Sequence, residues 1–369
     1  MKNLSTGTGL NHAVRVTIAA LSIVLGVGAA VPAAAQCPGD LTGNGFVDGG
    51  DLGPLLAAWG TSGGEFGGDL TADGVVNGAD LAFVIAGWGP CGQPTVPEWA
   101  TLVEAEPDPS VVTSPNLRAA ISATGLAWRV KDTRTQIEMV LIPPGSFTMG
   151  CSGSQLNGCF SEELPTHQVA LTQPFYLGRY EVTQAQWTSE MGWNPSQWIA
   201  ASTQVPMIQV PNRPVESVRW TWTQDFAFQT GMRLPTEAEW EYAYRAGTAT
   251  AFHGFTNYLN GTNSDGLLPQ IAWSSGNSSN QPRPVGGRAA NGLGLHDMAG
   301  NVAEWVEDLY GGYTSVAQTD PAGPSSGTNR VFRGGSYGSS SGGCRASTRF
   351  YSSPTSSYLD LGFRVARSP

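Results

Sequence analysis

The stretch RGGSYGSSSGGCRASTR, residues 333–349, contains Cys344, the side chain in this chain with the widest range of possible chemistry. A cysteine acts as a nucleophile or a metal ligand when it is a thiolate, and neighbouring positive charge lowers the pKa of the thiol. Arg333, Arg345 and Arg349 lie near Cys344 in the sequence and are candidates to supply that charge. A reactive Cys344 would capture a substrate thiol as a mixed disulfide, whereas a buried Cys344 would be an inert core residue. These residues alone leave both interpretations open.

Oxygen-bearing side chains form a second chemically capable group, in an internal repeat. The segments DLTGNGFVDGGDLGPLLAAWG (40–60) and DLTADGVVNGADLAFVIAGWG (69–89) match in register. Each begins with polar residues at the first, third, fifth, ninth and twelfth positions of a loop with glycine at the sixth, which is typical of calcium loops. The predicted ligands are Asp40, Thr42, Asn44, Asp48 and Asp51 in the first loop, and Asp69, Thr71, Asp73, Asn77 and Asp80 in the second.

The repeat also predicts local structure. An apolar stretch that we expect to be a helix follows each loop, and no helix is expected before it. The twelfth ligand is Asp, not the longer Glu of a helix–loop–helix calcium hand. Residues 36–91 therefore resemble a dockerin, a small α-helical module built from two calcium-binding loop–helix units. The resemblance implies a cohesin-like or cell-surface protein as partner, while a calcium-stapled spacer is the alternative.

The N-terminus and the net charge limit location and partners. Residues 1–35 combine basic residues, an apolar run and the small-residue sequence VPAAAQ, the pattern of a cleaved export signal. An uncleaved anchor is disfavoured, because the apolar run is short of a full membrane span. We expect a secreted or extracytoplasmic protein (periplasm or cell surface) with no membrane span after cleavage. A net charge of −10 argues against a nucleic-acid partner.

Export permits disulfides, and two pairs of the five cysteines are suitably placed. Cys37 and Cys91 bracket the repeat segment. Cys151 and Cys159 lie close together in one predicted loop. Cys344 is left over, and an odd cysteine in a secreted protein is a residue to examine further.

The remainder of the chain divides into a predicted linker and a large domain. Residues 92–135 contain scattered proline and acidic residues and read as a linker with one short helix at 115–123. Residues 136–369 show few regular elements. We expect a strand in IEMVLIPPGSFTMG, a helix capped by Thr183, and a helix that Pro235 and Thr236 open. Buried tryptophans, disulfides or bound cations must therefore stabilise much of this domain.

The twelve tryptophans are mostly expected to be core residues. Those assigned to the core include Trp187, Trp220, Trp222, Trp240, Trp273 and Trp305. Trp193 and Trp198 lie in the irregular stretch MGWNPSQWIAAS, and we expect these two to be exposed. Exposed tryptophans would be candidates for contacting a peptide or a glycan.

The large domain resembles a known family. The motifs that carry the resemblance are MVLIPPGSFTMG, PTHQVALTQPFYLGRYEVTQAQW, NRPVESVRW, RLPTEAEWEYAYRAG, NGLGLHDMAGNVAEWVEDLY, RVFRGGSYGSS and LGFRVAR. Together they identify residues 136–369 as similar to formylglycine-generating enzymes, also called sulfatase-modifying factors. The resemblance implies an α+β, C-type-lectin-like fold with little regular secondary structure and with calcium bound inside the domain. Active members oxidise a sulfatase cysteine to formylglycine with O₂ and a copper ion held by two cysteines.

The residues of DMAGNVAEW support the implied calcium site. Asp297 and Glu304 offer carboxylates on either side of a Gly-Asn turn, and hard oxygen ligands suit Ca²⁺. The resemblance adds Gly300 and Val302, which would bind through their backbone carbonyls. The alternative is that Glu304 only stabilises the turn.

The resemblance places the two copper cysteines of active members at Ser339 and Cys344, and Ser336 matches the serine of the motif. Cu(I) prefers thiolates, and a serine hydroxyl is a hard, weak ligand for it. The sequence therefore favours an exported, calcium-binding protein whose large domain is a binding or structural module with an unidentified peptide or glycan ligand. The alternative is a copper-dependent oxidase, in which Cu(I) would be the cofactor and Cys344, Ser339 and Ser336 the catalytic residues.

Overall fold

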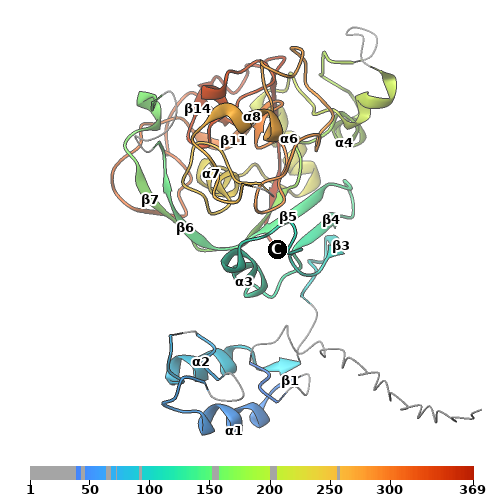
Figure 1. The fold of residues 1–369 in the computed structure, drawn as a ribbon. Helices are drawn as coiled ribbons and strands as arrows, with labels where there is room; N and C mark the ends of the chain where they lie inside the picture. The colour runs from blue at the N-terminus through green and yellow to red at the C-terminus, as the bar shows by residue number, and fades with distance from the viewer. Residues whose placement is uncertain are drawn as a thin grey trace, which may run out of the picture. The chain divides into compact units, whose positions relative to one another are not determined.

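The computed structural model describes residues 39–42, 46–63, 68–71, 73–90, 94–151, 158–199, 206–255 and 258–369. The predicted export signal, Asn44 and the Cys37–Cys91 pair lie outside these residues. The chain forms two compact units, Met1–Cys91 and Gly92–Pro369 (Figure 1). Among the described residues, no helix combines the length and the apolar character that crossing a bilayer requires.

The first unit contains the helices expected after the two loops, α1 (Gly49–Ala57) and α2 (Gly78–Ala86). Strand β1 (Phe46–Val47) pairs antiparallel with β2 (Gly89–Pro90). Each helix begins with a capping box, in which an N-cap side chain and the third helical residue satisfy each other's backbone N–H groups. In the part of this unit that the structure describes, the buried apolar core is small and consists of Val47, Leu55, Ala58, Val76 and Val84.

The second unit contains three main sheets joined by long loops (Figure 1). The five-stranded sheet is antiparallel, in the order β16 (Ala366–Arg367), β8 (Phe175–Gly178), β5 (Glu138–Ile142), β4 (Arg129–Asp132) and β3 (Ala100–Glu104). The four-stranded sheet has the order β14 (Arg349–Ser352), β13 (Arg330–Arg333), β11 (Ala303–Leu309) and β15 (Leu361–Phe363). The third has the order β12 (Gln318–Thr319), β7 (His167–Leu171) and β6 (Gly145–Met149). A short pair joins β10 (Ala299–Gly300) to β9 (Ala272–Trp273).

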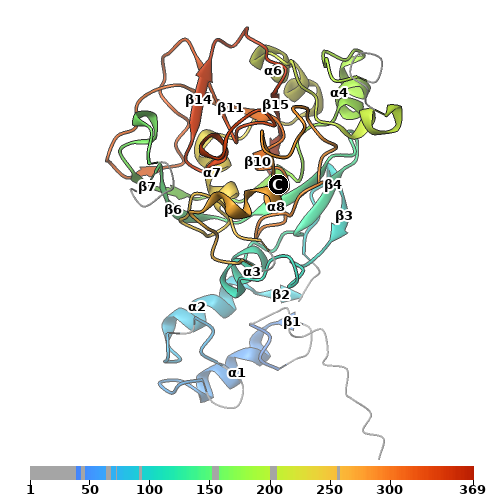
Figure 2. The same cartoon turned by 45° about the horizontal axis from the view of Figure 1, so that its top comes forward.

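Short helices fill the spaces around these sheets. They are α3 (Pro115–Ser122), α4 (Gln184–Met191), α6 (Trp220–Thr230), α7 (Glu237–Arg245) and α8 (Leu268–Ile271). The predicted caps are confirmed, because Thr183 and Thr236 each close a capping box at the start of α4 and α7. Helix α7 contacts both β6 and β11, and Figure 2 shows it beside the sheet that holds β14, β11 and β15. The predicted disulfide between Cys151 and Cys159 is also present.

The linker predicted over 92–135 differs from the structure. Strands β3 and β4 from this stretch extend the five-stranded sheet, and the helix expected at 115–123 is α3. Trp128 is fully buried and belongs to the main core. Each strand is short and is defined by its pairing. Strand β3 pairs with β4 at the other end of the stretch, and β4 also pairs with β5 outside it. Local composition therefore did not reveal these strands.

Three of the six tryptophans assigned to the core are fully buried, and Trp273 is only partly buried. Trp187, Trp240 and Trp305 have no exposed surface, and Trp220 and Trp222 pack against the same core while partly exposed. Trp193 is 40% exposed, as the sequence predicts. Trp198 is less exposed than the sequence predicts. It is half-buried, because its indole lies edge-on to Tyr337.

Candidate functional site

A glycine turn folds the segment 333–349 into its observed shape. Strand β13 ends at Arg333, and Gly334 and Gly335 follow with φ of +90° and +67°, where side chains are strained. A Cβ on Gly335 would lie 2.6 Å from the carbonyl oxygen of Gly343 and 3.0 Å from the Sγ of Cys344. The turn therefore needs glycine, because its backbone passes close to Gly343 and Cys344.

Two serines and a carboxylate form one hydrogen-bonded group beside this turn. The Ser336 hydroxyl donates to Oδ2 of Asp360 over 2.7 Å and lies 3.2 Å from the Ser339 hydroxyl. The Ser339 hydroxyl oxygen also accepts the Ser336 backbone N–H. The group lines a cavity of about 260 Å³, together with Phe332, Gly335, Phe350, Tyr358 and neighbours. The structure thus brings Ser336 and Ser339 together, with a neutral hydroxyl at each position.

Cys344 is a free cysteine with none of its side chain exposed. Burial raises the pKa of its thiol to about 12. Cys344 is not among the residues that line the cavity, whereas Gly335, whose backbone passes close to the Sγ of Cys344, is. Of the two interpretations of Cys344, the inert core residue agrees with this burial.

The three arginines near Cys344 are committed to other partners. Arg345 forms a fully buried ion pair with Glu163 at 2.6 Å, and Arg349 pairs with Glu237 at 2.6 Å. Arg333 contacts Glu241 and Glu237. The hypothesis that these arginines lower the pKa of the thiol is therefore wrong, since each is neutralised by a carboxylate and the thiol has lost its hydration. Sequence reasoning missed these acidic partners, which lie on other elements.

A second group of buried acids surrounds Asp297 and Glu304. Glu304 accepts two 2.6 Å hydrogen bonds from Arg364 and one of 2.7 Å from the Trp240 indole. Asp297 accepts the Gly286 N–H at Oδ2, while its buried Oδ1 has no hydrogen-bond partner. The backbone turns sharply here, with φ of +56° at Asp297 and +77° at Gly300.

Glu181 completes this acidic group, and sequence reasoning did not find it. Its carboxylate accepts the Asn301 side-chain amide over 2.6 Å and the Val302 N–H over 2.9 Å. Burial, with the nearby charges of Asp297 and Glu304, raises the pKa of Glu181 well above its ordinary value. Burial likewise raises the pKa of Asp297 to about 6.

The acidic group holds more negative than positive charge. Glu181, Asp297 and Glu304 are at most 1% exposed, and Arg364 is the fully buried arginine among them. Buried carboxylates need a proton or a cation to offset the loss of hydration. The unpartnered Oδ1 of Asp297 and the excess of carboxylates leave buried negative charge that a proton or a cation must offset, while both oxygens of Glu304 already accept from Arg364 or Trp240. The calcium ion predicted at Asp297, Gly300, Val302 and Glu304 would supply such a positive charge.

The described residues of the two front loops also gather acids. Carboxylate oxygens of Asp69, Asp73 and Asp80 lie within 4.8 Å of one another. Asp80 accepts hydrogen bonds from Thr71 and Asn77, and Asp51 accepts the equivalent bonds from Thr42 and Asp48. In the first loop the Thr42 hydroxyl also donates to Asp40. Asp51 and Asp80 therefore position their loops and cap their helices, and the second loop offers three acids suited to a cation.

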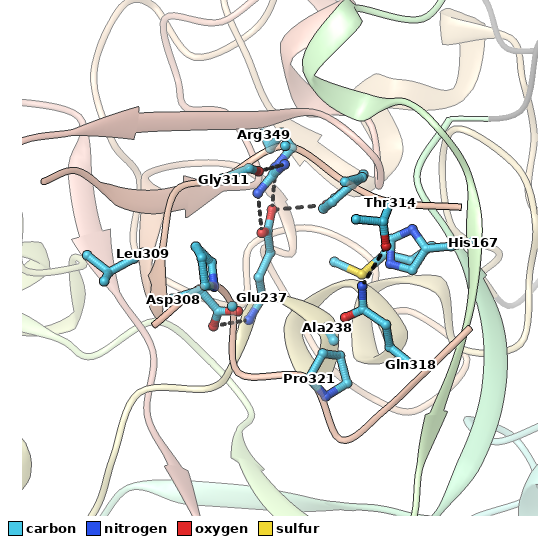
Figure 3. Close-up of a pocket in the computed structure, with 15 residues that line it drawn as sticks. His167, Glu237, Ala238, Asp308, Leu309, Gly311, Thr314, Gln318, Pro321 and Arg349 are labelled. Atoms are coloured by element: carbon cyan, nitrogen blue, oxygen red, sulfur yellow. Dashed lines mark hydrogen bonds and ion pairs between the residues drawn. The ribbon is translucent and has the colours of Figure 1, made fainter. Parts of the chain in front are cut away.

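Another cavity, of about 240 Å³, lies between α7, β7 and the loop after β11 (Figure 3). Asp308 and Glu237 both line it. Arg349 donates hydrogen bonds to both carboxylate oxygens of Glu237. Asp308 accepts the backbone N–H of Glu237 over 2.8 Å. Burial, and then repulsion from Glu237, raises the pKa of Asp308 to about 8. No motif marked this cavity in the sequence.

Comparison with known proteins identifies the large unit. Residues 127–369, more than half of the chain, match the model of the sulfatase-modifying factor enzyme 1-like domain. The chain belongs to this family. The C-type-lectin-like α+β fold expected for the sulfatase-modifying factor domain is confirmed, since its solved neighbours share that fold.

Related proteins include named enzymes and a protein of another description. The formylglycine-generating enzyme of Mus musculus is 33% identical over 221 residues, 57% of this chain and 56% of the mouse protein. That of Streptomyces coelicolor is 30% identical over 303 residues, 67% of this chain and 94% of the bacterial protein. The solved Treponema denticola variable protein 1 has a TM-score of 0.55 and 28% identity, covering 63% of this chain and 95% of its own. This chain thus spans little more than half of the mouse enzyme, and family membership alone does not fix an activity.

Proposed function

We propose that this protein is an exported, calcium-binding recognition protein whose sulfatase-modifying factor domain binds a ligand without oxidising it. The proposal rests on the side chains at the two positions that match the copper ligands of active members. One is the hydroxyl of Ser339, and the other is Cys344, a buried thiol whose pKa is raised to about 12. Copper that activates O₂ needs thiolates that can reach it. These two residues do not fit such an ion.

The cavity at Ser336 and Ser339 suits recognition. Its polar side chains include Ser336, Ser339 and Asp360, and the rings of Phe332, Phe350 and Tyr358 also line it. Mostly apolar walls with a few converging polar groups are typical of ligand sites. The cavity therefore offers hydrogen bonds to a ligand and no nucleophile of lowered pKa.

Calcium in this proposal has a structural part in the large domain. It would neutralise the buried carboxylates and fix the turn from Asp297 to Glu304. That turn continues into β11, the strand that pairs with both β13 and β15. A fixed β11 would in turn position the walls of the cavity, because Ala303 and Leu361 line it.

The first unit would act as a calcium-dependent attachment module in this proposal. Equivalent positions of its two repeats expose the same kind of side chain. Leu56 and Ile85 are each 57% exposed, and Trp59 and Trp88 are 45% and 53% exposed. Large apolar side chains exposed twice over on so small a unit support contact with another protein, such as a cohesin-like or cell-surface partner.

Copper binding by the purified protein tests the proposal. The protein lacking residues 1–35 is reduced and loaded with Cu(I), and a strong Cu(I) chelator then competes for the metal. Ser339→Cys is compared with Ser340→Cys, which adds a thiol at an exposed neighbouring position. We expect the native protein and Ser340→Cys to lose all copper to the chelator and to leave a cysteine-containing sulfatase peptide unchanged.

The outcomes separate the two functional classes. One equivalent of Cu(I) retained by the native protein, with conversion of the peptide cysteine to formylglycine, would establish the oxidase instead. Copper retained by Ser339→Cys alone would show that the fold still accommodates the metal and that the missing thiol explains its absence.

A further inference from the structure

An open groove adjoins the Ser336–Ser339 cavity. It has a volume of about 570 Å³ and is lined by Trp193, Trp222 and Tyr358 among others. Tyr358 lines both the groove and the cavity, so the two form a continuous surface. We call the groove at Trp193, Trp222 and Tyr358 the aromatic groove.

The rings of the aromatic groove are exposed but held in place. Trp193 is 40% exposed and Tyr358 is 46% exposed. Trp193 packs edge-on against Trp222 at 4.9 Å and against the fully buried Trp187 at 5.7 Å. The Tyr358 hydroxyl hydrogen-bonds that of Ser352 over 2.9 Å. A ligand would therefore meet ring faces that need little ordering, which reduces the entropy cost of binding.

A buried carboxylate accepts hydrogen bonds from the loop that carries Trp193 and fixes its backbone. Glu216 has no exposed surface, and its Oε1 accepts the backbone N–H groups of Gln197 and Trp198 over 2.7 and 2.9 Å. The Trp198 indole N–H donates to the Tyr337 hydroxyl over 3.2 Å. These bonds hold one wall of the aromatic groove at a set distance from Tyr358.

The polar lining of the aromatic groove is neutral. Among the residues that the structure describes, the polar lining consists of Gln197, Ser217 and Ser357, and none of the lining side chains is charged. The adjoining cavity adds the two serine hydroxyls and one carboxylate, that of Asp360. The exposed Arg219 stacks on the Trp222 ring at 4.6 Å but does not line the groove, so the lining itself supplies no cation to an acidic ligand. It offers hydrogen-bond donors and acceptors to a neutral ligand.

A neutral sugar chain matches this surface better than a peptide does. A pyranose ring presents an apolar C–H face to an aromatic ring and hydroxyls to the amide and hydroxyl side chains around it. An extended peptide can be bound by pairing with an exposed strand edge, and a proline-rich peptide can dock in an aromatic-lined groove. Here the lining residues lie on α6 and on irregular segments near 193–197, 217 and 357–359, so no strand edge runs along the groove.

We propose that the aromatic groove binds a neutral carbohydrate chain, with one sugar stacked on Tyr358 and the next extending its hydroxyls toward Ser336, Ser339 and Asp360. This inference rests on the proposed function and deepens it by naming the class of ligand. It requires no metal at the site of contact, because the rings and neutral polar groups supply the interactions.

Calorimetry with the protein lacking residues 1–35 tests the inference. The neutral probes are cellohexaose, xylohexaose and mannohexaose, and the anionic control is hexagalacturonate. An uncharged proline-rich hexapeptide represents the peptides that aromatic-lined grooves bind. Tyr358→Ala removes an exposed stacking ring. Phe228→Ala is its matched control, since Phe228 is 89% exposed on α6 and does not line the groove.

We expect at least one neutral hexaose to bind, Tyr358→Ala to weaken that binding about fivefold or more, and Phe228→Ala to leave it unchanged. Failure of all three hexaoses to bind at millimolar concentration would overturn the inference, as would tighter binding of the hexapeptide or of hexagalacturonate. Sugar binding that Tyr358→Ala does not weaken would also overturn it. Copper retention by the native protein would instead overturn the proposed function, so the two failures are distinguishable.

Discussion

Asp308 shows at the scale of one residue how the fold changes the chemistry of a side chain. Its carboxyl group is 4% exposed and accepts a hydrogen bond from the first residue of α7. Burial and the neighbouring Glu237 charge raise its pKa to about 8, from an ordinary value of 3.8. Between these two pH values the folded chain holds a proton at Asp308 that the unfolded chain has released.

This difference predicts a pH-dependent loss of stability. Because the folded state binds the extra proton between pH 4 and 8, raising the pH across that range destabilises it. Asp308→Asn keeps a neutral hydrogen-bond acceptor and removes the titration. We expect the free energy of unfolding of the native protein, relative to that of Asp308→Asn, to fall by about 1–3 kcal/mol from pH 5 to pH 8.

Urea unfolding at several pH values measures this difference. Comparing two variants at each pH cancels the contribution of every other titrating group that the substitution leaves unchanged. Parallel curves for the two proteins would contradict a raised pKa at Asp308.

Site residues that lie close together in the sequence could be predicted, and those that join the site from distant segments could not. Asp297 and Glu304 stand in one short motif, so their types and spacing sufficed to single them out. Glu181 joins the same group from more than a hundred residues away, and no local pattern marks it. The burial of Cys344 was equally out of reach, because it depends on the turn at Gly335 and on arginines that pair with distant acids.

Elements with strong local signals could be predicted, and those defined by their partners could not. The capping residues Thr183 and Thr236 predict the starts of α4 and α7, and both helices begin where expected. None of the residues of strand β3 is fully buried. Its sequence therefore shows no clear alternation of apolar and polar residues. Pairing with β4 makes it a strand. The predicted linker is therefore the edge of the five-stranded sheet.

Removing that edge should destabilise the domain. A chain truncated to 127–369, the span of the family match, lacks β3 and α3. It leaves the edge of β4 unpaired and removes Val112 and Ile121, which are fully buried in the main core. Losing two buried aliphatic side chains and a strand is expected to cost several kcal/mol, about 2–3 for each side chain.

Thermal unfolding of this truncated chain and of a chain comprising 94–369 makes the comparison. We expect a markedly lower melting temperature or aggregation for the shorter chain, because its unpaired β4 edge can pair with another molecule. Equal melting temperatures would show that 94–126 adds nothing to the fold.

The whole molecule combines two units that differ in how they are stabilised. The large unit has an extensive core with four fully buried tryptophans and a buried network of arginines and acids. Among the described residues of the first unit, five apolar side chains form a buried core. A core of that size rarely sustains a fold without disulfides or bound metal. The proposed calcium ions would therefore matter most for the first unit.

Removing calcium should unfold the first unit before the second. With its acids no longer bridged by cations, repulsion among groups such as Asp69, Asp73 and Asp80 opposes the loop geometry. Loss of the ions is expected to cost this unit about 2–4 kcal/mol, more than its small core can replace. Calorimetry with and without EGTA is expected to show the first of two transitions disappear, with loss of the helical signal of α1 and α2.

Variants assign each effect to its own site. A protein with both Asp51→Ala and Asp80→Ala should lack the low-temperature transition even with calcium present, because each carboxylate both caps a helix and closes a loop. Asp297→Ala should leave that transition unchanged and remove any effect of EGTA on the second one. If EGTA shifts neither transition in the native protein, calcium stabilises neither unit, and the acidic groups in both would have to be neutralised by protons instead.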